Sequence, residues 1–297
     1  MLAERLGYGP EERLLIVHAD DLGLAQSVNA AFFRGFATGL INSGSVMVPC
    51  PWFAEVAAFV RAHPEADVGL HLTLTSESPE HPTTPVAPPT SIPSLVDKNG
   101  YFLAQWTVET RIDPGEVAVE LRTQIQKALA AGLRPTHLDS HQYRAQLSGR
   151  AIFGVTRCLA HEYRLPVLIS REWLTRADYL RSGLTPRDVV LDRVAIIHGN
   201  AAPERWSAFY SRVLTQLPPG VSEILIHPGY DNEELQAFFG GREPWGAAWR
   251  QRDFDFFTSD AFRDLLAQQR ITLITWREIT AGLSDAKRRR LGVSWLP

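Results

Sequence analysis

The sequence predicts an α/β fold, an irregular (β/α) barrel similar to a TIM barrel, formed by a single domain. Eight short apolar runs rich in β-branched residues recur along the chain, and segments with helix signals separate them. No G-x-G-x-x-G follows the first run, which argues against a dinucleotide-binding sheet. A chain of 297 residues has the length for one such barrel.

The predicted strands are apolar on both faces, as is typical of parallel strands that helices cover. They span residues 13–20, 43–49, 66–74, 134–141, 165–170, 188–199, 222–229 and 271–276. Strands that alternate regularly with helices favour one barrel over an open doubly wound sheet. No internal repeat or linker marks a boundary, so we expect residues 1–297 to form one domain.

The helix signal is clearest in residues 113–132. Asp113 can cap the helix, Pro114 suits its first turn, and Gly132 can end it in the left-handed conformation. One apolar stripe follows the helical period: Val117, Leu121, Ile125 and Ala128. Two further helices are expected, one after Pro51 and one after a cap at Thr258 or Ser259.

Two connections are long. Residues 76–112 begin with six prolines in the twenty positions 76–95, and residues 229–257 are rich in glycine and aromatic residues. Long loops after strand ends usually build the mouth of a site, which is what we expect of both.

Composition excludes several classes of protein. Thirty basic and 33 acidic residues give a net charge of −3, so we expect no nucleic-acid partner, and the basic run 287–290 is interpreted as a solvated tail. Cys50 and Cys158 do not suggest a disulfide scaffold and suit a reducing compartment. No signal-peptide pattern and no apolar stretch of about 18 residues occurs, so we expect a cytoplasmic protein without a membrane partner.

Polar residues gather where the predicted strands end, which in a barrel is one face of the molecule. They are Asp20, Asp21, His71, His137, Asp139, His141 and His227. Each alone has an ordinary explanation as a helix cap or a hydrogen-bonded core residue, and His18 and His198 are interpreted in that way. Their joint occurrence at four strand ends predicts a site.

A carboxylate with two imidazoles forms an open site for a divalent metal. Such a metal polarises a carbonyl group and lowers the pKa of water, and a second carboxylate beside it can act as a general base. Asp20 and Asp21 point in opposite directions on a regular strand, whereas a turn would bring both to one site. No G-x-S-x-G occurs to support a serine nucleophile.

The chain resembles the YdjC-like family of carbohydrate deacetylases, which includes chitooligosaccharide deacetylases. Four motifs in order carry the resemblance: "HADDLG" (18–23), "VGLHLTLT" (68–75), "PTHLDSHQ" (135–142) and "IHPGYD" (226–231). It extends from about residue 13 to about residue 280. The chain departs from the family pattern at His18 (usually Asn), Leu22 (usually Phe) and Tyr143 (commonly His).

The resemblance implies a role for each matched residue. Asp20 becomes the general base and His227 the general acid, and the metal ligands are Asp21, His71 and His141. Supporting or substrate-lining positions are His137, Asp139, Tyr143 and Arg250. The match at Arg250 is the weakest, and a surface ion pair explains this arginine equally well.

The implied activity is metal-dependent removal of an acetyl group from an N-acetylated sugar or oligosaccharide. Zn²⁺ or Mg²⁺ is the expected metal, and Co²⁺ or Ni²⁺ would suit the same ligands. Family members are often dimers, so a homodimer is an open alternative. Three other functions stay open: a metal-dependent phosphoesterase, another amidohydrolase on the same barrel, and a non-catalytic sugar-binding barrel. The late-loop aromatics Trp245, Trp249 and Phe254 could stack on sugar rings or pack in the core.

Overall fold

The computed structural model describes residues 2–107, 109–185, 188–197, 201–240 and 244–282. Its strands are β1 (Arg13–Leu22), β2 (Ser43–Val46), β3 (Val68–Leu72), β4 (Leu138–Ser140), β5 (Arg193–Ile196), β6 (Gly220–Ile226) and β7 (Ile271–Leu273).

Helix α1 precedes β1, and the other helices lie between strands along the chain. They are α1 (Leu2–Arg5), α2 (Gln26–Ala37), α3 (Phe53–Ala62), α4 (Pro114–Ala130), α5 (Arg144–Leu147), α6 (Arg150–Tyr163), α7 (Arg171–Arg176), α8 (Asp178–Arg181), α9 (Trp206–Thr215), α10 (Glu233–Phe239), α11 (Ala247–Phe257) and α12 (Asp260–Gln268). Short 3₁₀ turns occupy Pro89–Ser91, His141–Tyr143 and Pro203–Arg205.

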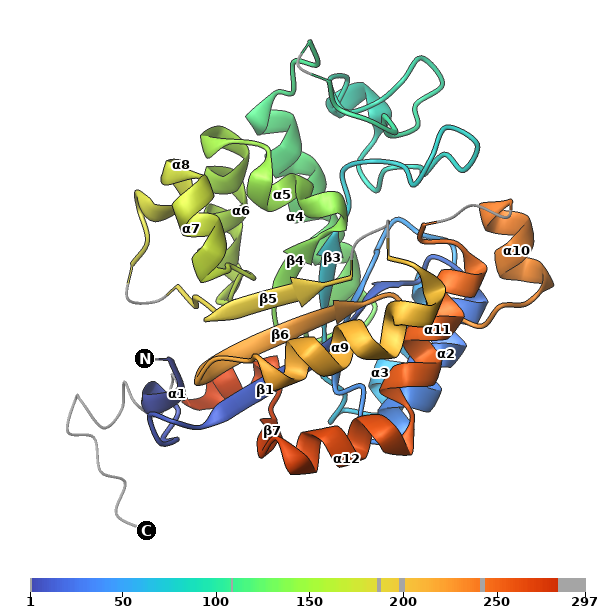
Figure 1. Ribbon diagram of the computed structural model, residues 1–297. Coiled ribbons are helices and arrows are strands. Elements are labelled where there is room, and N and C mark those ends of the chain that lie inside the picture. The colour runs from blue at the N-terminus through green and yellow to red at the C-terminus, as the bar shows by residue number, and fades with distance from the viewer. Residues whose placement is uncertain (1, 108, 186–187, 198–200, 241–243, 283–297) are drawn as a thin grey trace.

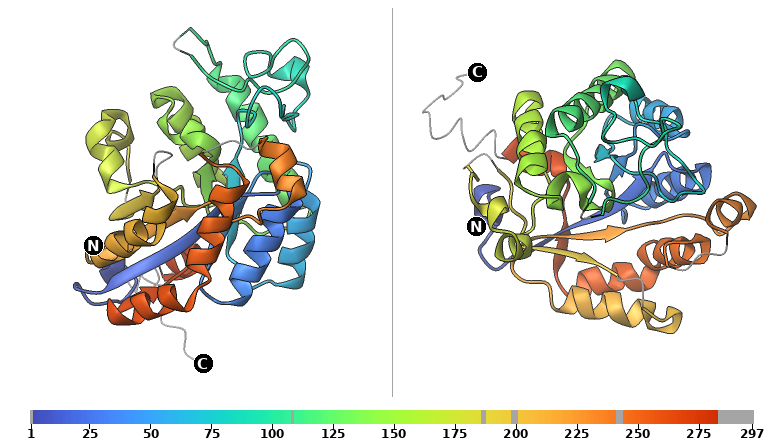
Figure 2. Two further views of the ribbon diagram at one scale, coloured as in Figure 1. Left: turned by 45° about the vertical axis from the view of Figure 1, so that its right-hand side comes forward. Right: turned by 90° about the horizontal axis from the view of Figure 1, so that it is seen from above.

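The strands form one parallel sheet in the order β4-β3-β2-β1-β6-β5, and β7 pairs with β1. Single bridges from Leu138 to Val167 and from Ser170 to Leu191 extend the pairing beyond β4 toward β5. The sheet therefore curves into a barrel surrounded by helices (Figure 1; Figure 2, right). This confirms the predicted irregular (β/α) barrel.

Most predicted strands are shorter in the structure, and three differ markedly from the prediction. Residues 165–170 form only the two bridges, because Pro166 has no N–H to donate, although its carbonyl accepts from Leu138 N at 2.8 Å. The predicted strands 134–141 and 188–199 shrink to β4 and β5. The last two residues of the predicted strand 188–199, His198 and Gly199, lie outside the described residues, as does the basic run 287–290.

β1 is the central strand, and Asn42 completes its pairing. β6 runs along one side of β1, whereas β7 pairs with its first residues and β2 with its last on the other side. Between these partners, Asn42 Oδ1 accepts from Val17 N (2.8 Å) and Asn42 Nδ2 donates to Ile274 O (2.8 Å). A side-chain amide thus satisfies backbone groups that the change of partner would leave unpaired.

The predicted helix signals are confirmed. Asp113 Oδ1 accepts from the backbone N–H groups of Gly115 and Glu116, and Gly132 takes a positive φ of 86° just after α4. The predicted stripe of α4 is buried throughout. Ser259 caps α12 by accepting from Phe262 N at 3.1 Å.

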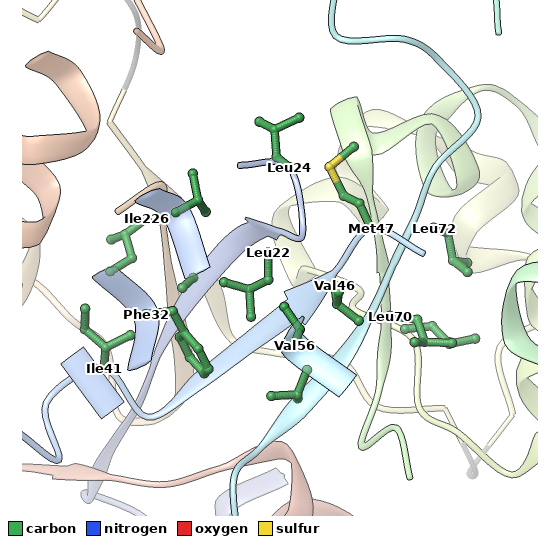
Figure 3. Close-up of a cluster of buried hydrophobic side chains, with 14 of the residues drawn as sticks. Leu22, Leu24, Phe32, Ile41, Val46, Met47, Val56, Leu70, Leu72 and Ile226 are labelled. Atoms are coloured by element: carbon green, nitrogen blue, oxygen red, sulfur yellow. The ribbon is translucent and has the colours of Figure 1, made fainter. Parts of the chain in front are cut away.

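Side chains of β1 alternate between two apolar clusters, as the pleat requires. Leu15 and Val17 join the larger cluster between sheet and helices, part of which Figure 3 shows around Leu22, Phe32, Val56 and Leu70. Leu14 and Ile16 face a second cluster that contains Val221, Leu225 and Trp276. His18 and Asp20 continue this second face, so polar groups lie above an apolar layer inside the barrel.

The two long connections differ from one another. The described part of residues 76–112 contains no strand and only one 3₁₀ turn, and it lies over the strand ends at the top of Figure 1. The buried Glu120 of α4 anchors this connection by accepting from Val86 N (3.0 Å) and Ala87 N (2.8 Å). Residues 229–257, in contrast, hold α10 and α11, so the prediction of a loop there was wrong.

No helix within the described residues has both the length and the apolar character needed to cross a bilayer.

Candidate active site

A cavity of about 300 Å³ lies at the carboxyl ends of the strands. Its lining includes the five residues for which sequence predicts chemistry: Asp20, Asp21, His71, His141 and His227. Tyr143 and Arg250 also line it. The strand ends therefore do converge, as a barrel requires.

Both acids of the "DD" pair reach this cavity because β1 ends irregularly. Asp21 has a φ of 66°, and the register between β1 and β2 shifts between Ala19 and Leu22. A left-handed residue turns the side chain away from strict alternation, so the carboxylates do not point in opposite directions. Such a conformation costs a non-glycine residue about 1 kcal/mol, and it commonly occurs at functional sites.

Asp21, His71 and His141 form a compact, buried group. Asp21 Oδ1 lies 3.4 Å from His71 Nε2 and 3.3 Å from His141 Nδ1, and one ligand atom from each residue lies within 4.8 Å of the others. The second nitrogen of each imidazole faces another carboxylate: His71 Nδ1 lies 3.0 Å from Asp139 Oδ1, and His141 Nε2 lies 3.3 Å from Glu77 Oε2. Metal-binding histidines usually have this arrangement, so the residues fit a divalent cation.

The charges of this group favour a cation as well. Burial alone would raise the pKa of Asp21, but the Arg250 guanidinium and the two imidazoles hold it well below its usual range. The pKa of His141 is raised to about 9, against the effect of burial, by Asp21 and Glu77. A metal ion would therefore displace protons that the carboxylates otherwise retain on the imidazoles.

Arg250 belongs to the site itself. Its side chain is 1% exposed, Nη2 donates to Asp21 Oδ2 at 2.7 Å, and Nε donates to Trp245 O at 3.0 Å. The alternative of a surface ion pair was wrong. Its guanidinium also lies over the Phe239 ring, 4.9 Å from the centroid, and α11 carries it rather than a loop.

His227 lies on the other side of the two acids. Its Nε2 is 3.7 Å from Asp20 Oδ2 and 4.0 Å from Asp21 Oδ2, and its backbone N–H donates to Asp253 Oδ2 at 2.9 Å. Burial lowers the pKa of His227, although Asp21 and Asp20 act in the opposite direction. Its imidazole is therefore neutral near neutral pH.

His18 lies directly beneath the cavity as a hydrogen-bonded core histidine, as expected. Its Nε2 is 3.2 Å from Asp20 Oδ1 and 3.1 Å from Asp139 Oδ2, and its Nδ1 is 3.4 Å from Glu223 Oε1. Burial would lower the pKa of His18, but the hydrogen bonds with Asp139 and Asp20 raise it to about 10. An imidazolium in this position neutralises the acids around it.

His137, a predicted supporting residue, lies deeper and lines no part of the cavity. Its ring stacks on Trp276 (centroids 4.9 Å apart) and meets His18 edge-on at 4.9 Å. It covers Gly69 so closely that a Cβ there would lie 2.5 Å from His137 Cε1. Asp139, in contrast, stands directly behind His71.

We expect Gly69→Ala to destabilise the protein by about 1–3 kcal/mol, because the stacked, fully buried His137 ring has no room to move. Gly154→Ala in α6 is the control, since nothing lies within 4 Å of a Cβ there. It should stabilise the helix by up to about 1 kcal/mol. Urea unfolding of both variants checks this, and equal stabilities would contradict it.

The three aromatic residues that could stack on sugar rings lie in different environments. Trp245 lines the cavity, with its ring 4.8 Å from that of His227. Trp249 is buried against Trp206 at 4.4 Å, and Phe254 packs on Tyr230 at 4.9 Å. Only the first of the three predicted stacking residues therefore borders the cavity.

Sequence reasoning missed Glu77. The residue lies near the start of the proline-rich connection, where no periodicity or motif marks it. Burial would raise the pKa of Glu77, but the contact with His141 holds it below its usual value. Glu77 and Gln142 line both the inner cavity and an outer cavity of about 560 Å³. The outer cavity also includes Trp106, Arg144 and Phe238.

The chain is similar to several known proteins. Residues 14–268 match the family described as YdjC-like protein. A carbohydrate deacetylase of Thermus thermophilus is 34% identical in an alignment that covers 95% of this chain and 99% of the relative. A chitooligosaccharide deacetylase of Yersinia enterocolitica is 34% identical over 166 residues, 54% of this chain and 60% of the relative.

Among solved structures, an Enterococcus faecalis protein described as a cellobiose-phosphate cleavage protein superposes with a TM-score of 0.76. It is 27% identical, and the match covers 90% of this chain and 99% of that one. The family match spans most of the sequence, and the Thermus thermophilus relative is similar over nearly its whole length. The chain therefore belongs to the YdjC-like protein family.

Proposed function

We propose that this protein is a metal-dependent deacetylase that hydrolyses the N-acetyl group of a sugar and releases acetate and a free amino sugar. The observation that carries the proposal is the cluster of Asp21, His71 and His141 with a further carboxylate, Asp20, in the same cavity. The names of the relatives support a carbohydrate substrate.

In this proposal Asp21, His71 and His141 hold one divalent metal ion, with Zn²⁺ or Mg²⁺ expected and Co²⁺ or Ni²⁺ also suited to the ligands. The ion would polarise the acetyl carbonyl and favour deprotonation of the attacking water. Arg250 keeps Asp21 ionised and fixes its second oxygen. Asp139 and Glu77 orient the imidazoles from behind.

Asp20 is the proposed general base. His18 lies at 3.2 Å from Oδ1 of Asp20, while Oδ2 faces His227 across the cavity. Asp20 accepts a proton from the water molecule as the water oxygen attacks the acetyl carbon. His227 delivers a proton to the nitrogen as the C–N bond breaks. Because the two side chains are 3.7 Å apart, the proton taken by Asp20 can reach the leaving amine through His227.

The test is acetate release from N-acetylated mono- and disaccharides by protein reconstituted with each metal. We expect acetate and free amine in equal amounts, a loss of about 10²-fold or more after chelation, and recovery when the metal returns. Phosphate release without acetate would instead identify a phosphoesterase. Sugar binding without acetate under every metal would identify a non-catalytic barrel.

A further inference from the structure

We infer that Glu77 is a positioning residue of the metal centre, because its carboxylate lies 3.3 Å from His141 Nε2 and favours the proton on that nitrogen, which leaves Nδ1 to face the metal beside Asp21. The inference rests on the proposed metal-dependent function. It assigns a defined role to the first part of the irregular connection that follows β3.

Each ring nitrogen of His141 faces a carboxylate. Nε2 lies 3.3 Å from Glu77 Oε2, and Nδ1 lies 3.3 Å from Asp21 Oδ1. A neutral imidazole carries one proton, and the nitrogen that binds a metal must be the unprotonated one. With Glu77 accepting at Nε2, the lone pair is on Nδ1, which faces the other ligands.

His71 shows the same arrangement with its nitrogens exchanged. Its Nδ1 faces Asp139 at 3.0 Å, and its Nε2 faces Asp21 at 3.4 Å. Asp139 comes from β4, in the sheet, whereas Glu77 comes from outside the sheet. The two imidazoles are thus oriented by carboxylates from separate parts of the fold.

Hydrogen bonds fix the backbone next to Glu77. The neighbouring Ser76 is buried, its N–H donates to Leu103 O (3.2 Å), and its hydroxyl donates to Phe102 O (2.7 Å). The same hydroxyl accepts from Thr83 N at 2.9 Å. These bonds tie the start of the connection to residues 83, 102 and 103, and the side chain of Glu77 is only 8% exposed.

The experiment compares metal affinity in wild-type protein, Glu77→Gln and Glu80→Gln. Each metal-free protein is titrated with Zn²⁺ in competition with a chromophoric chelator. We expect Glu77→Gln to bind about 10–100-fold more weakly, because an amide accepts the His141 proton less strongly than a carboxylate. Glu80→Gln, a nearby acid that lines only the outer cavity, should retain wild-type affinity.

Two further measurements separate positioning from damage to the fold. Thermal unfolding of the metal-free Glu77→Gln protein should match that of the wild type. Its Co²⁺ complex should show shifted absorption bands, whereas the bands of Glu80→Gln should stay in place. Unchanged Zn²⁺ affinity in Glu77→Gln, or an equal loss in both variants, would overturn the inference. Failure of the wild type to bind any divalent metal would overturn the proposed function itself.

Discussion

Asp20→Asn is expected to lower kcat for acetate release by about 10²–10⁴-fold while Zn²⁺ affinity stays close to that of the wild type. An amide has nearly the shape of the carboxylate and can place an oxygen at the same distance, 3.2 Å, from His18 Nε2. It cannot take a proton from water. The site should therefore assemble normally and turn over slowly.

Single-turnover acetate release and Zn²⁺ titration of the same preparation check this prediction. Asp260→Asn is a suitable control, because the Asp260 side chain is 98% exposed in the first turn of α12. A kcat within a few-fold of wild type in Asp20→Asn would remove Asp20 from the role of general base. Loss of Zn²⁺ binding would make Asp20 a ligand instead.

Asp21→Asn is expected to abolish measurable Zn²⁺ binding and to destabilise the metal-free protein less than Asp21→Ala does, since an amide oxygen can still accept from Arg250 Nη2. Asp21→Ala should also lose the metal, and in addition it should destabilise the metal-free protein by about 3–5 kcal/mol. The added loss arises because Arg250 is then a buried charge without its carboxylate.

A double variant isolates the charge effect. Asp21→Ala combined with Arg250→Met replaces the buried pair by apolar groups and should recover much of the stability lost in Asp21→Ala alone. Urea unfolding of the metal-free proteins measures this. The prediction would be contradicted if Asp21→Ala were as stable as the wild type, or if the double variant were no more stable than Asp21→Ala. The buried ion pair would then contribute little to the free energy of unfolding.

The sequence was sufficient to predict the barrel, most strands and the central residues of the candidate site. Parallel strands buried on both faces leave continuous apolar runs, and the cap at Asp113 and the stripe of α4 follow from local rules that tertiary contacts did not override. The polar residues that interrupt those runs stand out for the same reason. This is why Asp21, His71 and His141 stand out as candidate site residues, whereas their assignment as metal ligands came from the resemblance to the family.

The rest depended on long-range contacts. The left-handed turn at Asp21, which brings both acids to one cavity, results from a register shift against β2 that no local pattern records. Glu77 reaches His141 across 64 positions of sequence, from a stretch whose prolines indicate only irregular structure. Arg250 was assigned to a loop, because the glycines and aromatics of residues 229–257 concealed the helix α11.

Helix α11 forms hydrogen bonds to both sides of the site, at Asp21 and at His227. Arg250 and Asp253, three positions apart, lie on one face of it; the first contacts the end of β1 and the second holds the backbone of His227 after β6. Trp206 Nε1 and Tyr210 Oη also donate to Asp253, each at 2.9 Å, so α9 braces the helix. One helix therefore contacts both the metal-centre carboxylate and the backbone of the proposed proton donor. A displacement of α11 would act on both groups at once.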